Sequence, residues 1–200
     1  MISTLPALIA CALLAYLAGS IPFGLILTKL AGHGDVRAIG SGNIGATNVL
    51  RTGNKKLAAA TLICDALKGY APVAIASLYG PDMAAVATLA APLGHIFPVW
   101  LGFKGGKGVA TLCGALIGYA WPVALAALAT WIIIALVTRY SSLAAIVAAA
   151  SAPLYAFLFG DELEKILVML VLALLVIARH QTNIGRLLRG EESKIKLKKS

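Results

Sequence analysis

The run LPALIACALLAYLAGSIPFGLILTKL, residues 5–30, carries Lys29 as its sole charged residue. A helix needs about 20 apolar residues to cross the hydrocarbon core of a bilayer, so this run predicts a first membrane span. The whole chain has the same character, because 60% of its 200 residues are hydrophobic, 12% are charged and the mean hydropathy is +0.90. We therefore predict an all-α integral membrane protein whose residues 1–200 form a single multi-span domain.

Further apolar runs predict about seven spans in total. They lie at residues 57–79, 83–101, 109–137, 143–159 and 165–177. The run 109–137 is too long for one span, and Trp121-Pro122 divides it into a short span and a fuller one. Within the first run, residues 19–22 read GSIP and predict a kink, which is interpreted either as a functional feature or as packing.

The charges between the spans predict how the chain is inserted. With the N-terminus outside, one set of connections receives Arg37, Arg51, Lys55, Lys56, Lys104, Lys107, Arg139 and the basic tail. The other set receives Asp82, Asp161, Glu162 and Glu164, with Lys165 as its base. Basic residues are retained on the cytoplasmic side, so we expect the N-terminus outside and the C-terminus in the cytoplasm. Residues 190–200 form a short basic cytoplasmic tail, and the net charge of +9 then requires no nucleic acid.

Few polar side chains lie inside the predicted spans. Asp65 and Lys68 are three residues apart, so they share a helix face and neutralise each other; we favour helix packing over a functional site. Cys11, Cys64 and Cys113 are scattered without CxxC spacing and are interpreted as packing residues. No metal-ligand set is visible, so we expect no metal and no cofactor, and an activity that survives chelators.

The stretch GSGNIGATN, residues 40–48, predicts an anion-binding loop. Glycines allow successive backbone N–H groups to point at one ligand, and short polar side chains add hydrogen bonds. The candidate substrate-binding residues are Gly40, Gly42, Asn43, Gly45, Thr47, Asn48 and Arg51, with Ser41 as a candidate catalytic residue. The alternative is a solvated turn between two helices.

A second glycine-rich segment, KGGKG, covers residues 104–108 and precedes an apolar run. Backbone N–H groups at a helix N-terminus favour an anion, and lysine adds a point charge. The candidate substrate-binding residues here are Lys104, Gly105, Gly106, Lys107 and Gly108. The spacing is not that of a Walker A loop, and lysines at a membrane boundary also serve as orientation anchors.

The last predicted span continues into His180 and Asn183, which share a face if the helix stays intact. We take His180 as a candidate catalytic residue, because histidine is the side chain that titrates near neutrality. Asn183 is taken as a second one, because it shares that face. With the predicted topology, this segment, both glycine-rich loops and the serine pair at 141–142 reach the same membrane face. His33 and His95 each have a structural interpretation as well.

Three motifs, in order along nearly the whole chain, resemble those of the bacterial acyl-phosphate:glycerol-3-phosphate acyltransferases. They are GSIP (19–22) with GSGNIGATN (40–48) and Arg51, HIFP (95–98) with KGGKG (104–108), and HQTNI (180–184) with Arg186. The family's serine matches Ser141 or Ser142, and we take Ser142 as a substrate-binding residue. The HxxxxD motif of other glycerophosphate acyltransferases is missing.

The resemblance implies transfer of a fatty acyl group from acyl phosphate to the 1-hydroxyl of sn-glycerol 3-phosphate. The products are lysophosphatidic acid and inorganic phosphate, in the first acylation of phospholipid synthesis. The family uses neither acyl-CoA nor acyl carrier protein as donor, so an enzyme that produces acyl phosphate would be a functional partner. We expect a monomer that contacts the lipid bilayer and no nucleic acid.

The residues fit this chemistry, since both substrates carry phosphate. An acyl phosphate is already activated, so the protein mainly positions the hydroxyl and stabilises the leaving phosphate. Which loop holds which phosphate is open. His180 and Asn183 would orient the glycerol hydroxyls, with the proton accepted by the donor's phosphate or by His180. A nucleophilic serine is disfavoured, because no serine has a base at a defined spacing.

A membrane transporter of a phosphate ester is the alternative function. Intramembrane charges, kinked helices and anion-binding loops occur in transporters too. The sequence has no internal repeat, however, and its polar motifs gather on one predicted face rather than at a midplane. The acyltransferase is therefore the favoured function.

Overall fold

The structure is a computed structural model that describes residues 4–195. Within that range the secondary structure is ten α-helices and three short 3-10 helices, without strands. The helices divide into two compact units, Met1–Tyr119 and Ala120–Ser200. The predicted all-α class is confirmed, while a single multi-span domain stays a prediction. Residues 196–200 of the predicted basic tail lie outside the described residues.

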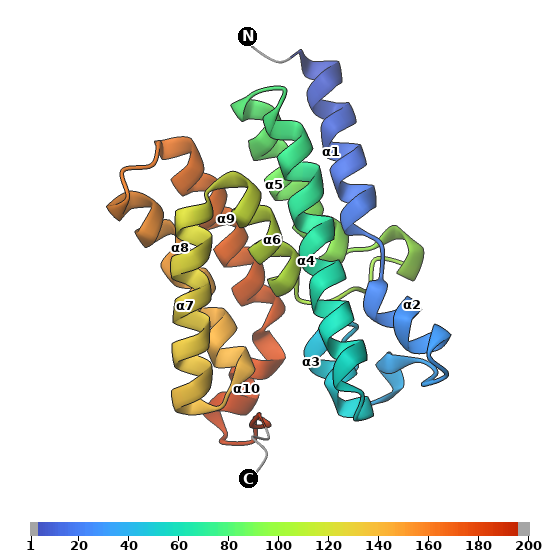
Figure 1. The fold of residues 1–200 in the computed structure, drawn as a ribbon. Helices are drawn as coiled ribbons and strands as arrows, with labels where there is room; N and C mark the ends of the chain where they lie inside the picture. The colour runs from blue at the N-terminus through green and yellow to red at the C-terminus, as the bar shows by residue number, and fades with distance from the viewer. Residues whose placement is uncertain (1–3, 196–200) are drawn as a thin grey trace. The chain divides into compact units, whose positions relative to one another are not determined.

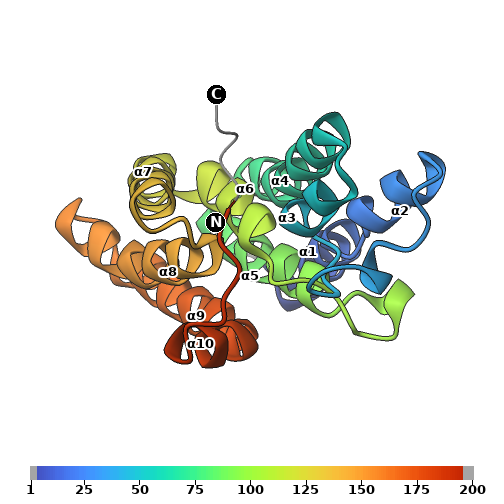
Figure 2. The same cartoon turned by 90° about the horizontal axis from the view of Figure 1, so that it is seen from below.

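Unit one contains four long or apolar helices and two shorter elements at one end. The helices are α1 (Leu5–Gly19), α2 (Phe23–Leu30), α3 (Ala46–Val49), α4 (Lys55–Ser77), α5 (Pro81–Ile96) and α6 (Val109–Tyr119). The 3-10 helices are Val36–Ala38, Leu50–Thr52 and Val99–Leu101. Figure 1 shows α1, α4, α5 and α6 packed together, and Figure 2 looks onto the end where α2 and α3 lie next to α4.

Small residues let the helices of unit one approach closely. One core cluster consists of Ala15, Val73, Ala76, Ala87, Ala90 and Ala115. A methyl group on Gly69 would overlap the backbone of Thr111, and one on Gly114 would overlap the backbone of Ala66. These two contacts join α4 to α6 in the manner of small-residue interfaces between membrane helices.

The predicted kink is a complete break between α1 and α2. Pro22 has no N–H to continue the helix, so α1 ends at Gly19 and α2 begins at Phe23. The carbonyl of Ile21, which the break exposes, accepts a hydrogen bond of 2.6 Å from Lys68 Nζ on α4. The lysine that the sequence paired only with Asp65 therefore also stabilises the broken backbone.

Unit two is a separate group of helices. It contains α7 (Trp121–Thr138), α8 (Ser141–Leu158), α9 (Leu163–Arg179) and α10 (Gln181–Leu188), with α8 packed against both α7 and α9. The boundary between α6 and α7 falls at Ala120, which confirms the predicted division of the run 109–137. The helix of the last predicted span does not continue through His180, which separates α9 from α10.

Five segments of the described chain are long and apolar enough to cross a membrane. They are Leu5–Leu30, Lys55–Ser77, Pro81–Leu101, Trp121–Thr138 and Ser141–Leu158. The apolar helix α6 has 11 residues, which gives it a length of about 17 Å against a core of about 30 Å. The helix α9, with 17 residues, is also shorter than the about 20 residues that a span usually needs. The total of seven spans and the orientation of the termini therefore stay predictions.

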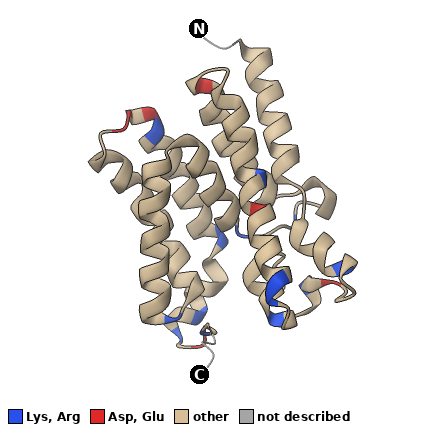
Figure 3. Cartoon of the chain, in the orientation of Figure 1, with Lys and Arg blue, Asp and Glu red and all other residues tan. Residues whose placement is uncertain are grey.

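In each unit most Lys and Arg lie toward one end, as Figure 3 shows, with acidic partners such as Asp35 and Glu192 among them. In unit one, Lys and Arg gather where α4 begins, whereas Asp82 lies in the first turn of α5, at the other end of α4. In unit two, Arg139 follows α7, and Asp161 lies between α8 and α9. This segregation is what the predicted orientation requires of each unit.

Candidate functional site

The first glycine-rich loop is anchored by a small apolar core of its own. Val36, Ile44 and Val49 pack with Leu25 of α2 and Ala58 of α4. A methyl group on Gly24 would overlap the carbonyl oxygen of Ile44, so α2 contacts the loop backbone directly. The loop is therefore a packed element with a fixed path rather than a freely solvated turn.

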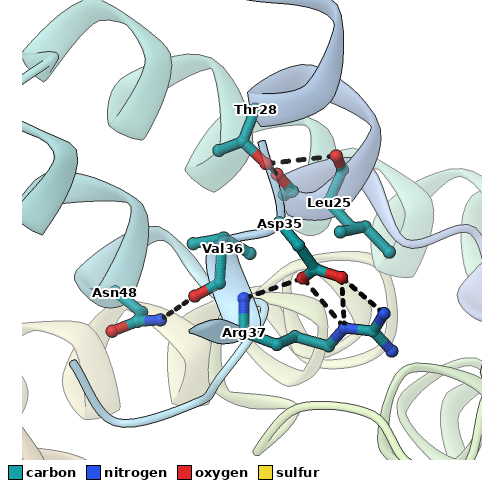
Figure 4. Close-up of polar contacts among 7 residues, drawn as sticks. Leu25, Thr28, Asp35, Val36, Arg37 and Asn48 are labelled. Carbon is teal, nitrogen blue, oxygen red and sulfur yellow. Dashed lines mark hydrogen bonds and ion pairs between the residues drawn. The ribbon is translucent and has the colours of Figure 1, made fainter. Parts of the chain in front are cut away.

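Asn48 organises the loop from the inside (Figure 4). Its buried amide accepts hydrogen bonds from Ser41 N at 3.0 Å and from Ser41 Oγ at 3.3 Å. Its Nδ2 donates to the carbonyl of Val36 at 2.8 Å, which Figure 4 shows, and also to those of Ile39 at 3.1 Å and Asn43 at 2.8 Å. A single side chain thus satisfies backbone groups across residues 36–43, which would otherwise need water.

The loop presents its glycine face to Arg51. Gly40 and Gly42 both have positive φ, at 56° and 69°, which side chains rarely adopt. A methyl group on Gly40 would overlap the Arg51 guanidinium and Asn48 Oδ1. Glycine at position 40 therefore lets a cation lie directly on the loop backbone.

A second cation near the loop is already paired within it. Arg37 donates to both carboxylate oxygens of Asp35, at 2.6 to 3.2 Å (Figure 4). The hydrogen bond from the Arg37 side chain lowers the pKa of Asp35 to about 2. The Arg37 guanidinium is thereby engaged with a carboxylate of the same loop.

The second glycine-rich loop, residues 104–108, folds back onto the end of α5. Gly105 N donates to the carbonyl of Ile96 and Gly106 N to the carbonyl of His95, both at 3.1 Å. Gly108 has a φ of 79°, and α6 begins at the next residue. The predicted placement of a glycine and lysine segment before a helix N-terminus is confirmed.

The two glycine-rich loops meet at Gly106. A methyl group there would overlap His95 Nε2 and lie 3.1 Å from Asn43 Oδ1, which belongs to the first loop. The Asn43 side chain also accepts a hydrogen bond of 3.2 Å from Gly45 N. The loops that the sequence predicted to converge are thus neighbours within unit one, with His95 beside them.

Unit two holds a second group of predicted site residues around one carboxylate. Glu192 Oε1 accepts hydrogen bonds from Ser142 Oγ at 2.8 Å and from Asn183 Nδ2 at 2.6 Å. Its Oε2 accepts from Arg186 Nε at 2.6 Å, and the Glu192 side chain is only 6% exposed. The start of the predicted basic tail is therefore bound to α8 and α10.

His180 is buried at the junction of α9 and α10. Its Nδ1 lies 2.7 Å from the carbonyl oxygen of Val176, one turn earlier in α9. A backbone carbonyl at that position holds the imidazole in a single orientation, with Nδ1 as the protonated nitrogen of the neutral ring.

Replacing Glu192 with Gln is expected to make the protein less stable at neutral pH and less sensitive to acid. Burial raises the pKa of Glu192, but hydrogen bonds from Arg186, Asn183 and Ser142 outweigh that effect, so the pKa lies below its ordinary value. The stability that the carboxylate adds is present above its ordinary pKa and is lost as the pH falls through the lowered value. We expect a loss of about 1 to 3 kcal/mol at pH 7.

Thermal unfolding of Glu192→Gln and wild type between about pH 7 and pH 4 measures this difference. The gap between the two proteins should narrow as the pH falls. Glu191→Gln is the matched control, because Glu191 is exposed and pairs with Arg189 at the surface. It should leave the dependence of the unfolding midpoint on pH unchanged. A gap that is constant across the whole range would contradict the expectation.

The structure places the predicted residues in two groups, one in each unit. Unit one brings together Gly40, Ser41, Asn43, Asn48, Arg51 and Gly106. Unit two joins Ser142 to Asn183 through Glu192.

Sequence reasoning missed Glu192, which it assigned to a basic tail. The acidic pair at 191–192, which follows Arg186 and Arg189, was the signal that pointed to it. No set of three potential metal-ligand side chains gathers within residues 4–195.

These features define an integral membrane protein whose two glycine-rich loops meet near buried polar side chains. The family model for glycerol-3-phosphate acyltransferase matches residues 9–190. Glycerol-3-phosphate acyltransferases of Brucella anthropi and Brucella ovis are 61% and 59% identical over 188 residues, which cover 94% of this chain and 93% of theirs.

Solved structures agree with the sequence comparison. The crystal structure of PlsY (YgiH), an integral membrane glycerol 3-phosphate acyltransferase, in its glycerol 3-phosphate form matches with a TM-score of 0.90 and 43% identity. That match covers 94% of this chain and 96% of the other. The lysophosphatidic acid form matches with a TM-score of 0.88, 42% identity and coverage of 94% and 95%. The chain therefore belongs to the glycerol-3-phosphate acyltransferase family.

Proposed function

We propose that this chain acylates the 1-hydroxyl of sn-glycerol 3-phosphate with acyl phosphate as the donor. The products are lysophosphatidic acid and inorganic phosphate. Membership of the family supports the acceptor, as do the glycerol 3-phosphate and lysophosphatidic acid forms of the related PlsY structure. The observation that carries the donor is the meeting of the two glycine-rich loops at Gly106, because two phosphate-bearing substrates need two adjacent loops that each carry a cation.

The reaction needs little covalent chemistry from the protein. The hydroxyl oxygen attacks the acyl carbonyl carbon, the bond from that carbon to the phosphate oxygen breaks, and phosphate leaves with the electron pair. The hydroxyl proton passes to the departing phosphate, or to His180 as the alternative base. Positioning and charge stabilisation then supply most of the rate enhancement.

Each loop has a role in this scheme. Arg51, lying on Gly40, binds one phosphate, and the Ser41 hydroxyl, whose own bond to Asn48 is long at 3.3 Å, turns toward the same ligand. Lys104 and Lys107 bind the other, and the glycines between them, bonded to the end of α5, leave space for it beside the loop backbone. Asn48 itself has its side chain fully engaged inside the loop, so its contribution is to hold the Ser41 N–H in place.

The acceptor hydroxyls are oriented by His180 and Asn183, with Ser142 as a binding residue. His180 is suited to this because the Val176 carbonyl fixes its ring. Asn183 and Ser142 both contact Glu192, which fixes their rotamers. Ordered side chains lose less conformational entropy when substrate binds.

The surroundings follow from the same proposal. The enzyme lies in the bacterial inner membrane as a monomer, and its loops face the cytoplasm, where the segregated basic residues of each unit belong. The acyl chain of the donor stays in the bilayer beside the lipid-facing helices. An enzyme that supplies acyl phosphate acts immediately before it.

Purified protein in a lipid mesophase should release inorganic phosphate from palmitoyl phosphate only when glycerol 3-phosphate is present. Lysophosphatidic acid should form in equal amount. His180→Ala should slow this release by at least about 100-fold, since a positioned acid–base group contributes that much. Phosphate release and product formation are measured together by colorimetry and mass spectrometry.

His33→Ala is the matched control, because His33 is exposed in the loop after α2 and should be dispensable. Turnover with acyl-CoA or acyl carrier protein but not with palmitoyl phosphate would contradict the proposed donor and leave the family assignment intact. Loss of turnover in EDTA, restored by a divalent ion, would contradict the metal-free scheme.

A further inference from the structure

A buried series of polar contacts in unit one leads from the break in α1 to the second glycine-rich loop. Lys68 Nζ lies 2.8 Å from Asp65 Oδ1 and donates to the carbonyl of Ile21 at 2.6 Å. The Lys68 ammonium also lies 5.8 Å from the centre of the Phe23 ring. The side chains of Asp65 and Lys68 are 2% and 3% exposed, so both charges are neutralised inside the helix bundle.

His95 stands between this ion pair and the loop. Its Nδ1 lies 3.8 Å from Asp65 Oδ1, within ion-pair range, and its side chain is 4% exposed. On the other side of the ring, Nε2 occupies the space that a methyl group on Gly106 would need. The carbonyls of His95 and Ile96 also accept hydrogen bonds from the loop backbone. The imidazole therefore lies between the acidic side chain, which is near Nδ1 but beyond hydrogen-bond distance, and the loop, which is next to Nε2.

Helix packing alone does not explain why a buried ion pair, Asp65 with Lys68, stands at this position. Moving two charges out of water costs several kcal/mol each, and well-packed apolar side chains often do the same structural work at no loss. Ionisable side chains inside membrane helices usually accompany a functional element. Here the pair lies next to two elements: Lys68 is bonded to the Ile21 carbonyl, and Asp65 is near the His95 ring, which adjoins the loop at residues 105–106.

We propose that Asp65 and Lys68 orient the His95 imidazole, and that His95 is a positioning residue for the loop that binds one substrate phosphate. This inference rests on the proposed function, because residues 104–108 are the proposed phosphate loop. The negative charge of Asp65, 3.8 Å from Nδ1, favours by electrostatic attraction the ring orientation that turns Nδ1 toward it. The ring then keeps Gly106 against Asn43, so that both loops retain their relative position.

The test is a double-mutant cycle on purified protein. One arm is Asp65→Asn combined with Lys68→Gln, which removes both charges and leaves no unpaired buried ion. The other arm is His95→Gln, and the third protein carries all three changes. The KM for palmitoyl phosphate, the KM for glycerol 3-phosphate, kcat and the midpoint of thermal unfolding are measured for each protein.

We expect each arm to raise the KM for one of the two phosphate substrates by about tenfold, with a smaller change in kcat. The combined protein should be no worse than His95→Gln alone, because the pair acts through the ring. Multiplied effects in the combined protein would overturn the proposal, as would an unchanged KM in the folded variant without the pair. Thr88→Val, which removes a buried hydrogen bond two turns earlier in α5, is the control and should keep both KM values.

A second readout separates this inference from the proposed function. Inorganic phosphate, the probe common to both substrates, should raise the unfolding midpoint of the wild type, and by less in the variant without the pair. An equal rise in both proteins would overturn the inference even if turnover is normal. If the wild type did not turn over palmitoyl phosphate, acyl phosphate would be contradicted as the donor. The effect of inorganic phosphate on the unfolding midpoint would still test the role of the ion pair.

Discussion

Asn48→Asp is expected to abolish measurable acyl transfer and to lower the thermal stability of unit one. The exchange keeps the shape of the side chain but replaces the Nδ2 donor with an oxygen that faces the carbonyls of Val36, Ile39 and Asn43. Asn48 is 1% exposed, so water does not compensate. Buried unpaired polar groups cost about 1 to 3 kcal/mol each, and we expect a total loss of about 3 kcal/mol.

Activity should fall further than stability does. The Ser41 backbone N–H depends on Asn48 Oδ1 for its direction, and a displacement of about 1 Å in a catalytic loop costs about 100-fold in rate. The unfolding midpoint and phosphate release, measured on the same preparation, separate the two losses. The test applies to protein that remains folded at the assay temperature.

Asn54→Asp is the matched control for this substitution. Asn54 caps α4 by accepting a hydrogen bond of 3.0 Å from Leu57 N, and an aspartate accepts the same bond. A negative charge at a helix N-terminus is also favourable. Wild-type activity with Asn54→Asp and lost activity with Asn48→Asp is the expected pattern. Equal activity in both variants would show that the loop does not need its internal donor.

Gly106→Ala is expected to lower kcat/KM by about 100-fold, because a methyl group at this position has no space. It would overlap His95 Nε2 and approach Asn43 Oδ1 to 3.1 Å, so the two loops would have to separate. The φ of Gly106 lies outside the left-handed region, so crowding and not backbone strain is the cause. Steady-state kinetics with both substrates measure the loss.

Gly185→Ala provides the comparison for the same chemical change. Its new methyl group would meet only the end of the Arg189 side chain, at 3.3 Å, and that chain is free to move. Alanine is favoured over glycine inside a helix by about 1 kcal/mol, so α10 should be at least as stable as before. Retained activity in Gly106→Ala would mean that the loops do not meet as closely as the geometry indicates.

Site residues on loops were predictable where glycines and short polar residues cluster locally. The stretches 40–48 and 104–108 stood out for that reason. In the structure they lie next to each other in unit one, where Gly106 adjoins Asn43. The purpose of Asn48 was not predictable, because an asparagine in a polar loop looks the same whether it binds a ligand or satisfies five backbone and side-chain groups. Glu192 was missed because the chain must turn back after α10 for it to reach Arg186, Asn183 and the distant Ser142, and no local spacing predicts that turn.

The sequence by itself determined the membrane class, the break at Pro22, the division near Ala120 and the position of both glycine-rich loops. Each of these depends on local properties: the length of an apolar run, the missing N–H of proline, or the freedom of glycine. Only the tertiary structure decided which side chains meet. The contact of Lys68 with Ile21 and that of His95 with Gly106 join different elements, and such contacts depend on helix packing that no local spacing encodes.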